Sequence, residues 1–279
     1  MTDRYAVFGN PIAHSQSPQI HRQFAQQTQQ SMDYQKQLVE REGFAEAAKE
    51  FFASGGQGLN ITTPFKQDAF SYADSTTARA RCAGAVNTLA TQPDGTVLGD
   101  NTDGVGMVTD IVHNLGWQIR HKRVLILGAG GAVRGVLEPL LAEQPQHIVI
   151  ANRTVEKALQ LAKQFAEQGY LLGCGLDSLY GQSFDLIINA TSAQLQGQLP
   201  QLPDSLVATD NPAEQVACYD MMYGAKPTAF VAWAQQRGAL ASDGLGMLVE
   251  QAAESFVLWR GVRPQTAEVI QWLRQQIGS

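Results

Sequence analysis

A glycine-rich segment near the middle of the chain has the residue types that could bind a diphosphate. Val124–Leu127 is a run of apolar residues, and Gly128-Ala129-Gly130-Gly131-Ala132 follows it directly. Glycines lack Cβ atoms and let the backbone approach phosphate oxygens closely, and the first N–H groups of a following helix would face the negative charge. The order of strand, glycines and helix therefore predicts dinucleotide binding, while a β-to-α turn without a ligand stays the alternative.

Two serines follow the first predicted strand, Tyr5–Gly9. A helix is expected to start at Ser17 and Pro18, because Ser is a good N-cap and Pro suits the first helical position. Ser15 and Ser17 would then lie between the end of a strand and the start of a helix, where α/β proteins place ligands. From the residues alone, capping and ligand binding are equally open for these serines.

A lysine and two carboxylates follow other predicted strands. Lys66 comes after the strand Leu59–Ile61 and would meet the positive end of a helix dipole, so an anionic partner would explain it. Asp100 and Asp103 follow a hairpin predicted around Pro93-Asp94-Gly95. Capping of the next helix by Thr102 or Asp103 would account for one of these acidic residues.

The elements that must carry the glycine-rich segment alternate regularly. We expect four strands in this part of the chain, with helices near 132–142, 154–168 and 227–237 between them. The strands are expected at Val124–Leu127, Ile148–Ala151, Leu186–Asn189 and Ala217–Met221. This alternation predicts an α/β fold in which a doubly wound parallel sheet forms a domain of its own.

The second of these strands ends in Asn152-Arg153-Thr154, about where NAD-specific enzymes place an acidic residue for the ribose 2′-hydroxyl. That acid is absent here. Arg153, with Lys157 one helical turn later, offers positive charge instead and fits the 2′-phosphate of NADP. The sequence therefore favours NADP over NAD, with exposed surface cations as the alternative.

Composition limits the possible partners. The 279 residues carry a formal net charge of −6 and no long run of Lys or Arg, which argues against nucleic acid or an anionic membrane as a partner. No signal peptide or membrane span is recognised, so we expect a cytoplasmic protein. Cys82, Cys174 and Cys218 are scattered without ligand spacing, and neither a disulfide framework nor a metal site is predicted.

The chain resembles the bacterial shikimate dehydrogenase family along nearly its whole length, and the shared motifs occur in the family's order. The motifs are Gly9-Asn10-Pro11-Ile12-Ala13-His14-Ser15-Gln16-Ser17-Pro18, Asn60-Ile61-Thr62-Thr63-Pro64-Phe65-Lys66, Gly84-Ala85-Val86-Asn87-Thr88, Gly99-Asp100-Asn101-Thr102-Asp103-Gly104, Gly128-Ala129-Gly130-Gly131-Ala132, Asn152-Arg153-Thr154 and Asp243-Gly244-Leu245-Gly246-Met247. The resemblance implies NADPH-dependent reduction of 3-dehydroshikimate to shikimate, in the biosynthesis of chorismate and the aromatic amino acids.

The resemblance also implies roles for individual residues. Ser15 and Ser17 would bind the substrate carboxylate, and Tyr223 matches a further substrate-binding tyrosine of the family. The ring hydroxyls would be held by Asn60, Thr62, Lys66, Asn87, Asp103 and Gln251. The NADP-binding residues would be Gly128, Ala129, Gly130, Gly131, Ala132, Asn152, Arg153, Thr154, Lys157, Thr191, Ser192, Met221 and Gly244.

Reduction of a ketone builds negative charge on its oxygen, so a proton donor must stand beside it. Our hypothesis is that Lys66 and Asp103 form the catalytic acid/base pair, with Asp103 orienting Lys66 and compensating its charge. Two rival readings remain: a quinate/shikimate dehydrogenase that uses NAD, and a catalytically silent sensor that binds NADP and a shikimate-like ligand.

The resemblance implies two domains. Residues 1–103 would form an N-terminal α/β substrate domain, completed by C-terminal helices over 245–279. Residues 104–244 would form a Rossmann-like doubly wound parallel sheet for NADP. The oligomeric state is left open between monomer and homodimer.

Overall fold

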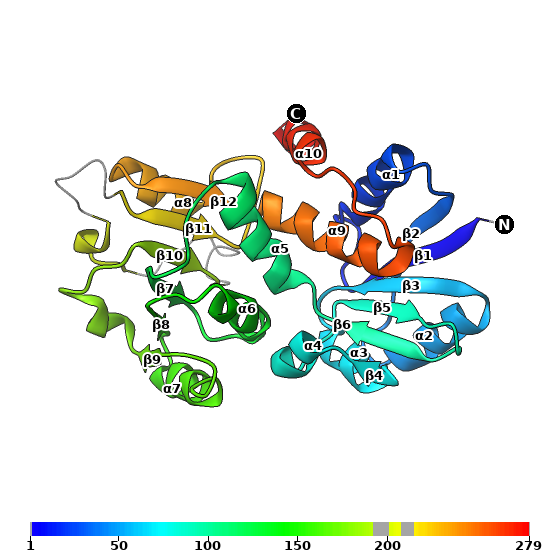
Figure 1. Ribbon diagram of the computed structural model, residues 1–279, viewed down its shortest axis with the longest axis horizontal. Coiled ribbons are helices and arrows are strands. Elements are labelled where there is room, and N and C mark those ends of the chain that lie inside the picture. The colour runs from blue at the N-terminus through cyan, green and yellow to red at the C-terminus, as the bar shows by residue number, and fades with distance from the viewer. Residues whose placement is uncertain (1, 192–200, 208–214, 279) are drawn as a thin grey trace. The chain divides into compact units, whose positions relative to one another are not determined.

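The computed structural model describes residues 2–191, 201–207 and 215–278 (Figure 1). The chain divides into two compact units, and each contains one six-stranded sheet. The first unit consists of Met1–Gly106 and Leu248–Leu273, and the second of Met107–Met247 and Arg274–Ser279. The first unit is therefore assembled from two segments that lie far apart in the sequence.

The sheet of the first unit is mixed, with the strand order β2-β1-β3-β5-β6-β4. Strands β2, β1 and β3 are parallel, β5 is antiparallel to both β3 and β6, and β4 is parallel to β6. The strands are β1 (Asp3–Gly9), β2 (Met32–Leu38), β3 (Gly56–Ile61), β4 (Ser75–Thr76), β5 (Thr88–Thr91) and β6 (Val97–Asp100).

From Tyr5 to Phe8 the side chains of β1 are buried on both faces of this sheet, which explains the apolar run at these positions. Ala6 and Phe8 belong to a core cluster with residues of α2, and Tyr5 and Val7 pack on the other face with Trp259 of α9. The helices of the chain up to residue 109 are α1 (Ser17–Gln27), α2 (Phe44–Ala53), α3 (Lys66–Tyr72), α4 (Ala78–Ala83) and α5 (Asp103–Thr109). The C-terminal helices are α9 (Leu245–Arg260) and α10 (Ala267–Gly278).

The sheet of the second unit is entirely parallel, with the order β12-β11-β10-β7-β8-β9. This is the Rossmann order, and it reverses direction between β7 and β10. The strands are β7 (Arg123–Leu127), β8 (His147–Ala151), β9 (Leu171–Cys174), β10 (Leu186–Asn189), β11 (Ala217–Asp220) and β12 (Leu240–Asp243). The helices are α6 (Gly131–Ala142), α7 (Val155–Gln164) and α8 (Ala229–Gln236). The predicted doubly wound parallel sheet is thus confirmed.

Two details differ from the sequence expectations. Strands β9 and β12 were not predicted, because they are only partly buried, unlike the equally short but fully buried β10 and β11. The prediction that Ser17 is the N-cap of α1 is wrong: Gln16 occupies that position without a side-chain cap, and Ser17 is the first helical residue. The Ser17 hydroxyl is used elsewhere, since it accepts a 3.2 Å hydrogen bond from Ser15 Oγ.

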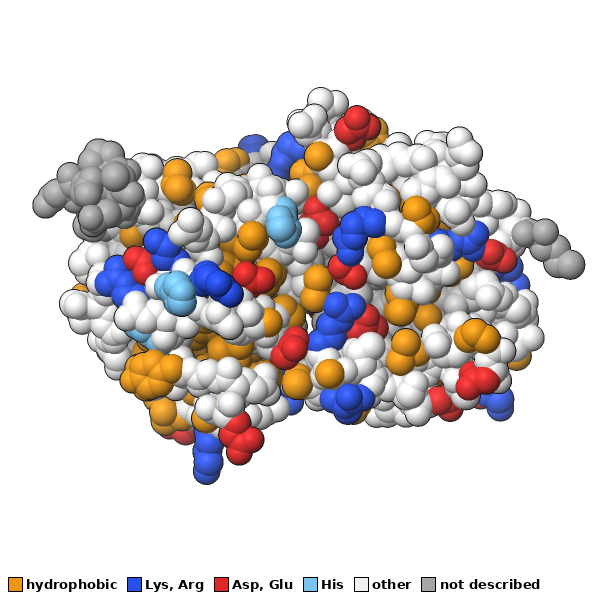
Figure 2. All heavy atoms as spheres, in the orientation of Figure 1, with side chains coloured by type: hydrophobic (Ala, Val, Ile, Leu, Met, Phe, Trp, Pro, Cys, Tyr) orange, Lys and Arg blue, Asp and Glu red, His pale blue; other side chains and the backbone are white. Residues whose placement is uncertain are grey.

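Basic and acidic side chains are interspersed on the face of the molecule shown in Figure 2. Within the described part of the chain, no helix combines the length and the apolar composition needed to cross a bilayer. The same residues contain no group of three or more His, Cys, Asp or Glu side chains placed to hold a metal ion.

Candidate active site

Strand register brings the polar segments of the first unit to one edge of its sheet. Because β1 and β3 are parallel neighbours, with Phe8 opposite Ile61, the segments after both strands leave the sheet at the same edge. Strand β5 is antiparallel to β3 and starts beside Asn60, at Thr88. Asp100, at the end of β6, is paired with Thr88 in turn. Four loops with polar residues therefore meet where β3 ends.

Lys66 and Asp103 form an ion pair at this edge, with 2.5 Å between Nζ and Oδ2. Lys66 is the first residue of α3 and Asp103 is the first residue of α5. The side chains retain 33% and 18% of their exposure, so the pair is only partly covered and open to a ligand. The anionic partner expected for Lys66 is thus the carboxylate of Asp103, which belongs to the same unit.

Asn87 lies at the centre of the contacts around this pair. Its Nδ2 donates to Asp103 Oδ1 at 2.8 Å and to Thr102 Oγ1 at 2.9 Å, and its Oδ1 accepts from the Thr102 N–H at 2.9 Å. Gln251, from helix α9, accepts a longer contact from the same Nδ2 at 3.4 Å. Asn87 therefore contacts two other predicted substrate-binding residues, Asp103 and Gln251, directly.

The neighbouring acidic residue, Asp100, has a different surrounding. Its side chain is buried, forms an ion pair with Arg79, and accepts hydrogen bonds from Thr77 Oγ1 at 2.6 Å and from Arg79 Nε at 2.7 Å. Burial raises the pKa of the Asp100 carboxyl, but these donors outweigh burial and hold the pKa below its ordinary value. Asp100 is a structural carboxylate, whereas Asp103 faces the partly open site.

Asn60 is also brought to this edge, but all four of its hydrogen-bonding positions are occupied inside the protein. Oδ1 accepts from Tyr34 Oη at 2.7 Å and lies 3.1 Å from His21 Nε2. Nδ2 donates to Ser255 Oγ at 3.0 Å and to Thr88 Oγ1 at 3.2 Å. A primary amide offers two acceptor and two donor positions, so Asn60 has none left for a ligand.

The serines and Thr62 lie in the loops that follow β1 and β3. The Ser15 and Ser17 hydroxyls are 3.2 Å apart, and Ser15 Oγ accepts from the Ser17 N–H at 3.3 Å. The Thr62 N–H donates to the Phe8 carbonyl at 3.0 Å. A Cβ at Gly9 would lie only 2.4 Å from the Thr62 methyl group, so glycine is needed there for the two loops to approach.

The glycine-rich loop of the second unit leaves β7 at the point where the strand order reverses. Gly128 has φ +109°, and a Cβ there would lie 3.2 Å from the Ala190 carbonyl oxygen, at the end of β10. Gly130 is the N-cap of α6 and supplies no side-chain cap, and a Cβ at Gly130 or Gly131 would meet no atom within 4 Å. The exposed N–H groups at the start of α6 and the open space beside them fit a diphosphate.

The cations predicted to select NADP follow the neighbouring strand β8. Asn152 Nδ2 donates to the Thr154 carbonyl at 2.8 Å and closes the turn into α7, which begins at Val155. Arg153 and Lys157 are exposed, and neither makes an ion pair or side-chain hydrogen bond within residues 2–191, 201–207 and 215–278. Their positive charges are available for a phosphate group.

The remaining predicted residues of the second unit lie near the ends of β10 and β11. Thr191 donates to Asn189 Oδ1 at 2.8 Å, while Ser192 lies outside the described residues. A Cβ at Gly244 would come within 2.5 Å of the Met221 carbonyl oxygen, so the backbones at these two positions are in close contact. Tyr223 is partly buried, and burial, followed by the negative charge of Asp243, raises the pKa of its phenol.

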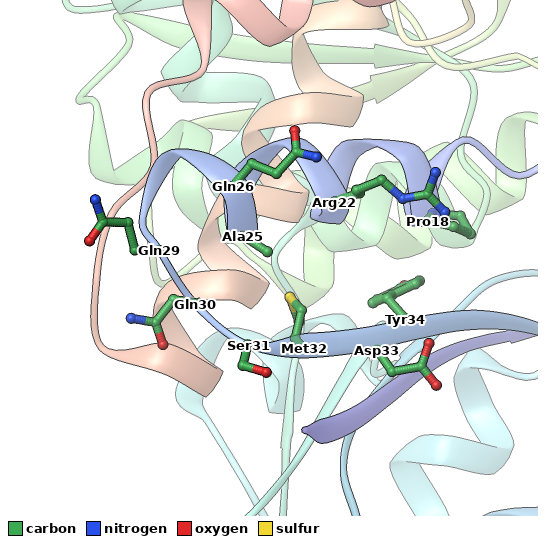
Figure 3. Close-up of a pocket in the computed structure, with 10 residues that line it drawn as sticks. All are labelled: Pro18, Arg22, Ala25, Gln26, Gln29, Gln30, Ser31, Met32, Asp33 and Tyr34. Atoms are coloured by element: carbon green, nitrogen blue, oxygen red, sulfur yellow. The ribbon is translucent and has the colours of Figure 1, made fainter. Parts of the chain in front are cut away.

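A cavity of about 410 Å³ lies between α1 and the start of β2 (Figure 3). Its lining includes Arg22 and Gln26 from the helix and Asp33 and Tyr34 from the strand. None of the predicted site residues lines it. The candidate site is defined instead by the polar contacts at the edge of the sheet.

Sequence reasoning missed three buried polar residues that contact Asn60: His21, Tyr34 and Ser255. A signal for two of them was present, since His21 adjoins the apolar face of α1 and Ser255 interrupts the apolar face of α9. No comparable signal marks Tyr34, which is an ordinary residue for a strand.

Family models match most of the chain. Residues 7–89 match the shikimate dehydrogenase substrate binding domain, residues 110–197 match shikimate / quinate 5-dehydrogenase, and residues 244–274 match the shikimate 5′-dehydrogenase C-terminal domain.

Individual proteins match it over nearly their full length. The shikimate dehydrogenase (NADP(+)) of Cellvibrio japonicus is 60% identical, over 99% of both chains. The crystal structure of an Ael1 enzyme from Pseudomonas putida is 45% identical with a TM-score of 0.92, over 98% of both chains. The structure of shikimate 5-dehydrogenase from Thermus thermophilus, in complex with NADP(H) and shikimate, is 29% identical with a TM-score of 0.85, over 98% of this chain and 99% of that one.

Proposed function

Because this chain belongs to the shikimate dehydrogenase family, we propose that it catalyses the reversible, NADPH-dependent reduction of 3-dehydroshikimate to shikimate. The observation that carries this proposal is the partly exposed ion pair of Lys66 and Asp103, with Asn87 and Gln251 beside it. A ketone reductase needs a proton donor at the carbonyl oxygen, and a ring with several hydroxyls needs donors and acceptors around it. This group supplies both.

In the proposed reaction NADPH, when bound, supplies the hydride. The Lys66 ammonium donates a hydrogen bond to the substrate carbonyl oxygen, stabilises the negative charge that develops there, and transfers a proton to it. Asp103 holds Nζ in place through its Oδ2 and balances its charge, while Asn87 fixes the other carboxylate oxygen. In the reverse direction Lys66 accepts the proton from the substrate hydroxyl.

We assign the ring hydroxyls to Thr62, Lys66, Asn87, Asp103 and Gln251. The paired hydroxyls of Ser15 and Ser17 would donate to the substrate carboxylate, and Tyr223 is retained as a further substrate-binding residue. Asn60, which the family resemblance placed with the hydroxyl-binding residues, is given a supporting role instead because its own polar atoms are engaged.

For NADPH, we propose that Gly128, Ala129, Gly130, Gly131 and Ala132 hold the diphosphate through backbone N–H groups. Arg153 and Lys157, with Asn152 and Thr154 shaping the turn, would hold the 2′-phosphate. Thr191, Met221 and Gly244 would line the rest of the cofactor, and Ser192 is retained as a prediction. The first unit would thus be the substrate domain and the second the NADP domain.

The test follows the loss of NADPH absorbance after 3-dehydroshikimate is added. We expect rapid oxidation of NADPH, much slower oxidation of NADH, and little reduction of NADP with quinate. Comparable kcat/KM values for NADH and NADPH would overturn the cofactor assignment. Stabilisation of the protein by shikimate without any NADPH consumption would favour the sensor. The cytoplasmic location and the choice between monomer and homodimer stay predictions.

A further inference from the structure

His21, on helix α1, is a fully buried histidine that the proposed chemistry does not use. Its ring stacks on Tyr34 with centroids 4.4 Å apart and is surrounded by Phe24, Phe256 and Trp259. Its Nδ1 is the one buried side-chain polar atom without a hydrogen-bond partner in the described residues. Its Nε2 lies 3.1 Å from Asn60 Oδ1.

This surrounding determines the state of the imidazole. Asn60 Oδ1 is an acceptor, so Nε2 must carry the proton and Nδ1 must be bare. Burying an unprotonated ring nitrogen among aromatic rings costs less free energy than burying an unpaired N–H group or a charge. Burial lowers the pKa of His21 to about 3, although the hydrogen bond to Asn60 acts in the opposite direction. Tyr34 is the titratable group packed on the ring, and burial keeps its phenol protonated by raising its pKa.

From His21 a chain of donors leads to the Lys66–Asp103 pair. Asn60 Nδ2 donates to Ser255 Oγ at 3.0 Å, and Ser255 Oγ lies 2.7 Å from Thr88 Oγ1. Thr88 Oγ1 donates to Asn87 Oδ1 at 3.0 Å, and Asn87 Nδ2 donates to Asp103 Oδ1 at 2.8 Å.

The donor hydrogens of this hydrogen-bonded series can all point in the same direction. When Thr88 gives its proton to Asn87, the Ser255 hydroxyl can donate to Thr88 Oγ1 at 2.7 Å or to the Gln251 carbonyl at 3.1 Å, and the shorter contact favours donation to Thr88. The direction is then His21 to Asn60, Ser255, Thr88, Asn87 and finally the Asp103 carboxylate. His21, Asn60, Ser255, Thr88 and Asn87 are all buried, so water does not compete for these bonds. Aligned donors that end on a carboxylate polarise one another favourably.

A second branch leads from Tyr34 to the predicted carboxylate-binding serines. Tyr34 Oη donates to Asn60 Oδ1 at 2.7 Å, and the Ser17 hydroxyl acts on the Tyr34 phenol, whose pKa it lowers against the larger effect of burial. The stacked pair of His21 and Tyr34 therefore supports both ends of the proposed substrate site. Both rings donate to the same oxygen of Asn60 and so fix which way its amide faces.

We propose that His21 is a positioning residue of the active site: its neutral, Nε2-protonated imidazole sets the orientation of the Asn60 amide and thereby the donor chain that holds Asn87 and Asp103. The role rests on the proposed function. It explains why a polar ring is placed in an aromatic cluster, where a phenylalanine would pack without leaving a nitrogen unpaired. His21 does not touch the substrate and is not a catalytic residue.

The kinetic test compares three variants at a temperature well below their unfolding transitions. His21→Phe keeps a ring but removes the donor, and His21→Gln restores a donor without the ring. Phe24→Leu is the matched control, because Phe24 is equally buried on the same helix and packs on His21 without any polar contact of its side chain. We expect His21→Phe to lower kcat for 3-dehydroshikimate about tenfold and leave KM for NADPH unchanged. His21→Gln should recover kcat to within about threefold of the original chain, and Phe24→Leu should lose stability with kcat unchanged.

A kcat for His21→Phe within twofold of the original chain would overturn the proposal, as would an equal loss of kcat in Phe24→Leu. Nitrogen-15 NMR of labelled histidine in the unaltered chain gives a second reading that needs neither activity nor a folded variant. We expect one histidine with protonated Nε2 and bare Nδ1 that does not titrate between pH 5.5 and 8. A buried histidine in the Nδ1–H tautomer, or its titration in this range, would overturn the proposal. If the unaltered chain failed to oxidise NADPH, the proposed function would be wrong. The tautomer of His21 measured by NMR would still test whether the series of hydrogen bonds from His21 to Asp103 is present.

Discussion

The two units hold their predicted ligand-binding residues in different ways. In the first unit, side chains from α1, β3, β5 and α9 bond to one another, and few of their polar atoms are left free. In the second unit, the glycine-rich loop, the start of α6, Arg153 and Lys157 have few partners of their own. The first arrangement fixes a geometry before a ligand arrives, whereas the second leaves N–H groups and charges for the ligand to satisfy.

This difference predicts that changes in the first unit act mainly on kcat and changes in the second act mainly on KM for NADPH. The largest effect is expected for Lys66→Ala. Removing a general acid costs about 10²–10⁴-fold in rate, so we expect kcat to fall by that order with KM for NADPH unchanged. Lys49→Ala, which removes an exposed lysine of α2, is the control for the loss of charge. A near-normal kcat with a raised substrate KM would make Lys66 a binding residue only.

A smaller effect is expected for Arg153→Ala. A hydrogen bond to a charged group contributes about 1.5–3 kcal/mol, so KM for NADPH should rise by roughly 10- to 150-fold while kcat/KM for NADH stays unchanged. Steady-state rates with both cofactors measure this. Lys163→Ala, on the exposed surface later in α7, is the matched control. An equal loss with NADH would mean that Arg153 does not recognise the 2′-phosphate.

Two glycines of the cofactor loop separate backbone strain from ligand binding. Gly128→Ala should lower the free energy of unfolding by about 1–3 kcal/mol, because φ +109° is costly for alanine and its Cβ would press on the Ala190 carbonyl. Gly130→Ala has φ −93° and open space around its Cβ, so stability should be retained while KM for NADPH rises. Thermal unfolding and cofactor titration of both variants test this. A stable Gly128→Ala would contradict the strain argument.

The smallest effect concerns the pH dependence of stability in the first unit. The pKa of His21 is about 3 in the folded chain, below the value of about 6.5 expected after unfolding. The unfolded chain therefore binds the proton first as pH falls, and this stability, present above pH 6.5, is lost progressively between pH 6.5 and 3. Between pH 7.5 and 5.5 the loss should be about 1.4 kcal/mol. Urea unfolding at both pH values should show it in the original chain and not in His21→Phe, which retains the other histidines.

Local patterns predicted the second unit well and the first unit only in part. The glycine-rich loop, the missing acid after β8 and the alternation of strands and helices are all short-range signals. The contacts of Asn60 with Ser255, 195 positions later in the chain, depend on tertiary packing and have no local signature. The family resemblance brought Asn60 to the site, but only the geometry shows that its four positions are filled from within.

The predicted helix cap shows the same limit of local sequence patterns. Ser is a typical N-cap residue, yet the Ser17 hydroxyl accepts a hydrogen bond from Ser15, and Gln16 is at the cap position of α1. For Lys66 the sequence predicted correctly that an anion was needed. Asp103 was named as that anion only with the help of the family resemblance, because the approach of α3 and α5 depends on the pairing of β3, β5 and β6 and has no local signature.

The dependence of the first unit on helix α9 has a consequence for biosynthesis. Ser255, Phe256 and Trp259 leave the ribosome only after Met107–Met247 has been made, which takes on the order of 10 s at the usual rates of translation. Until then the Asn60 amide lacks one of its two hydroxyl acceptors, and one side of the His21 ring is uncovered. All strands of the second sheet have been synthesised before the first unit can complete its packing against α9. The order of folding is therefore expected to reverse the order of synthesis.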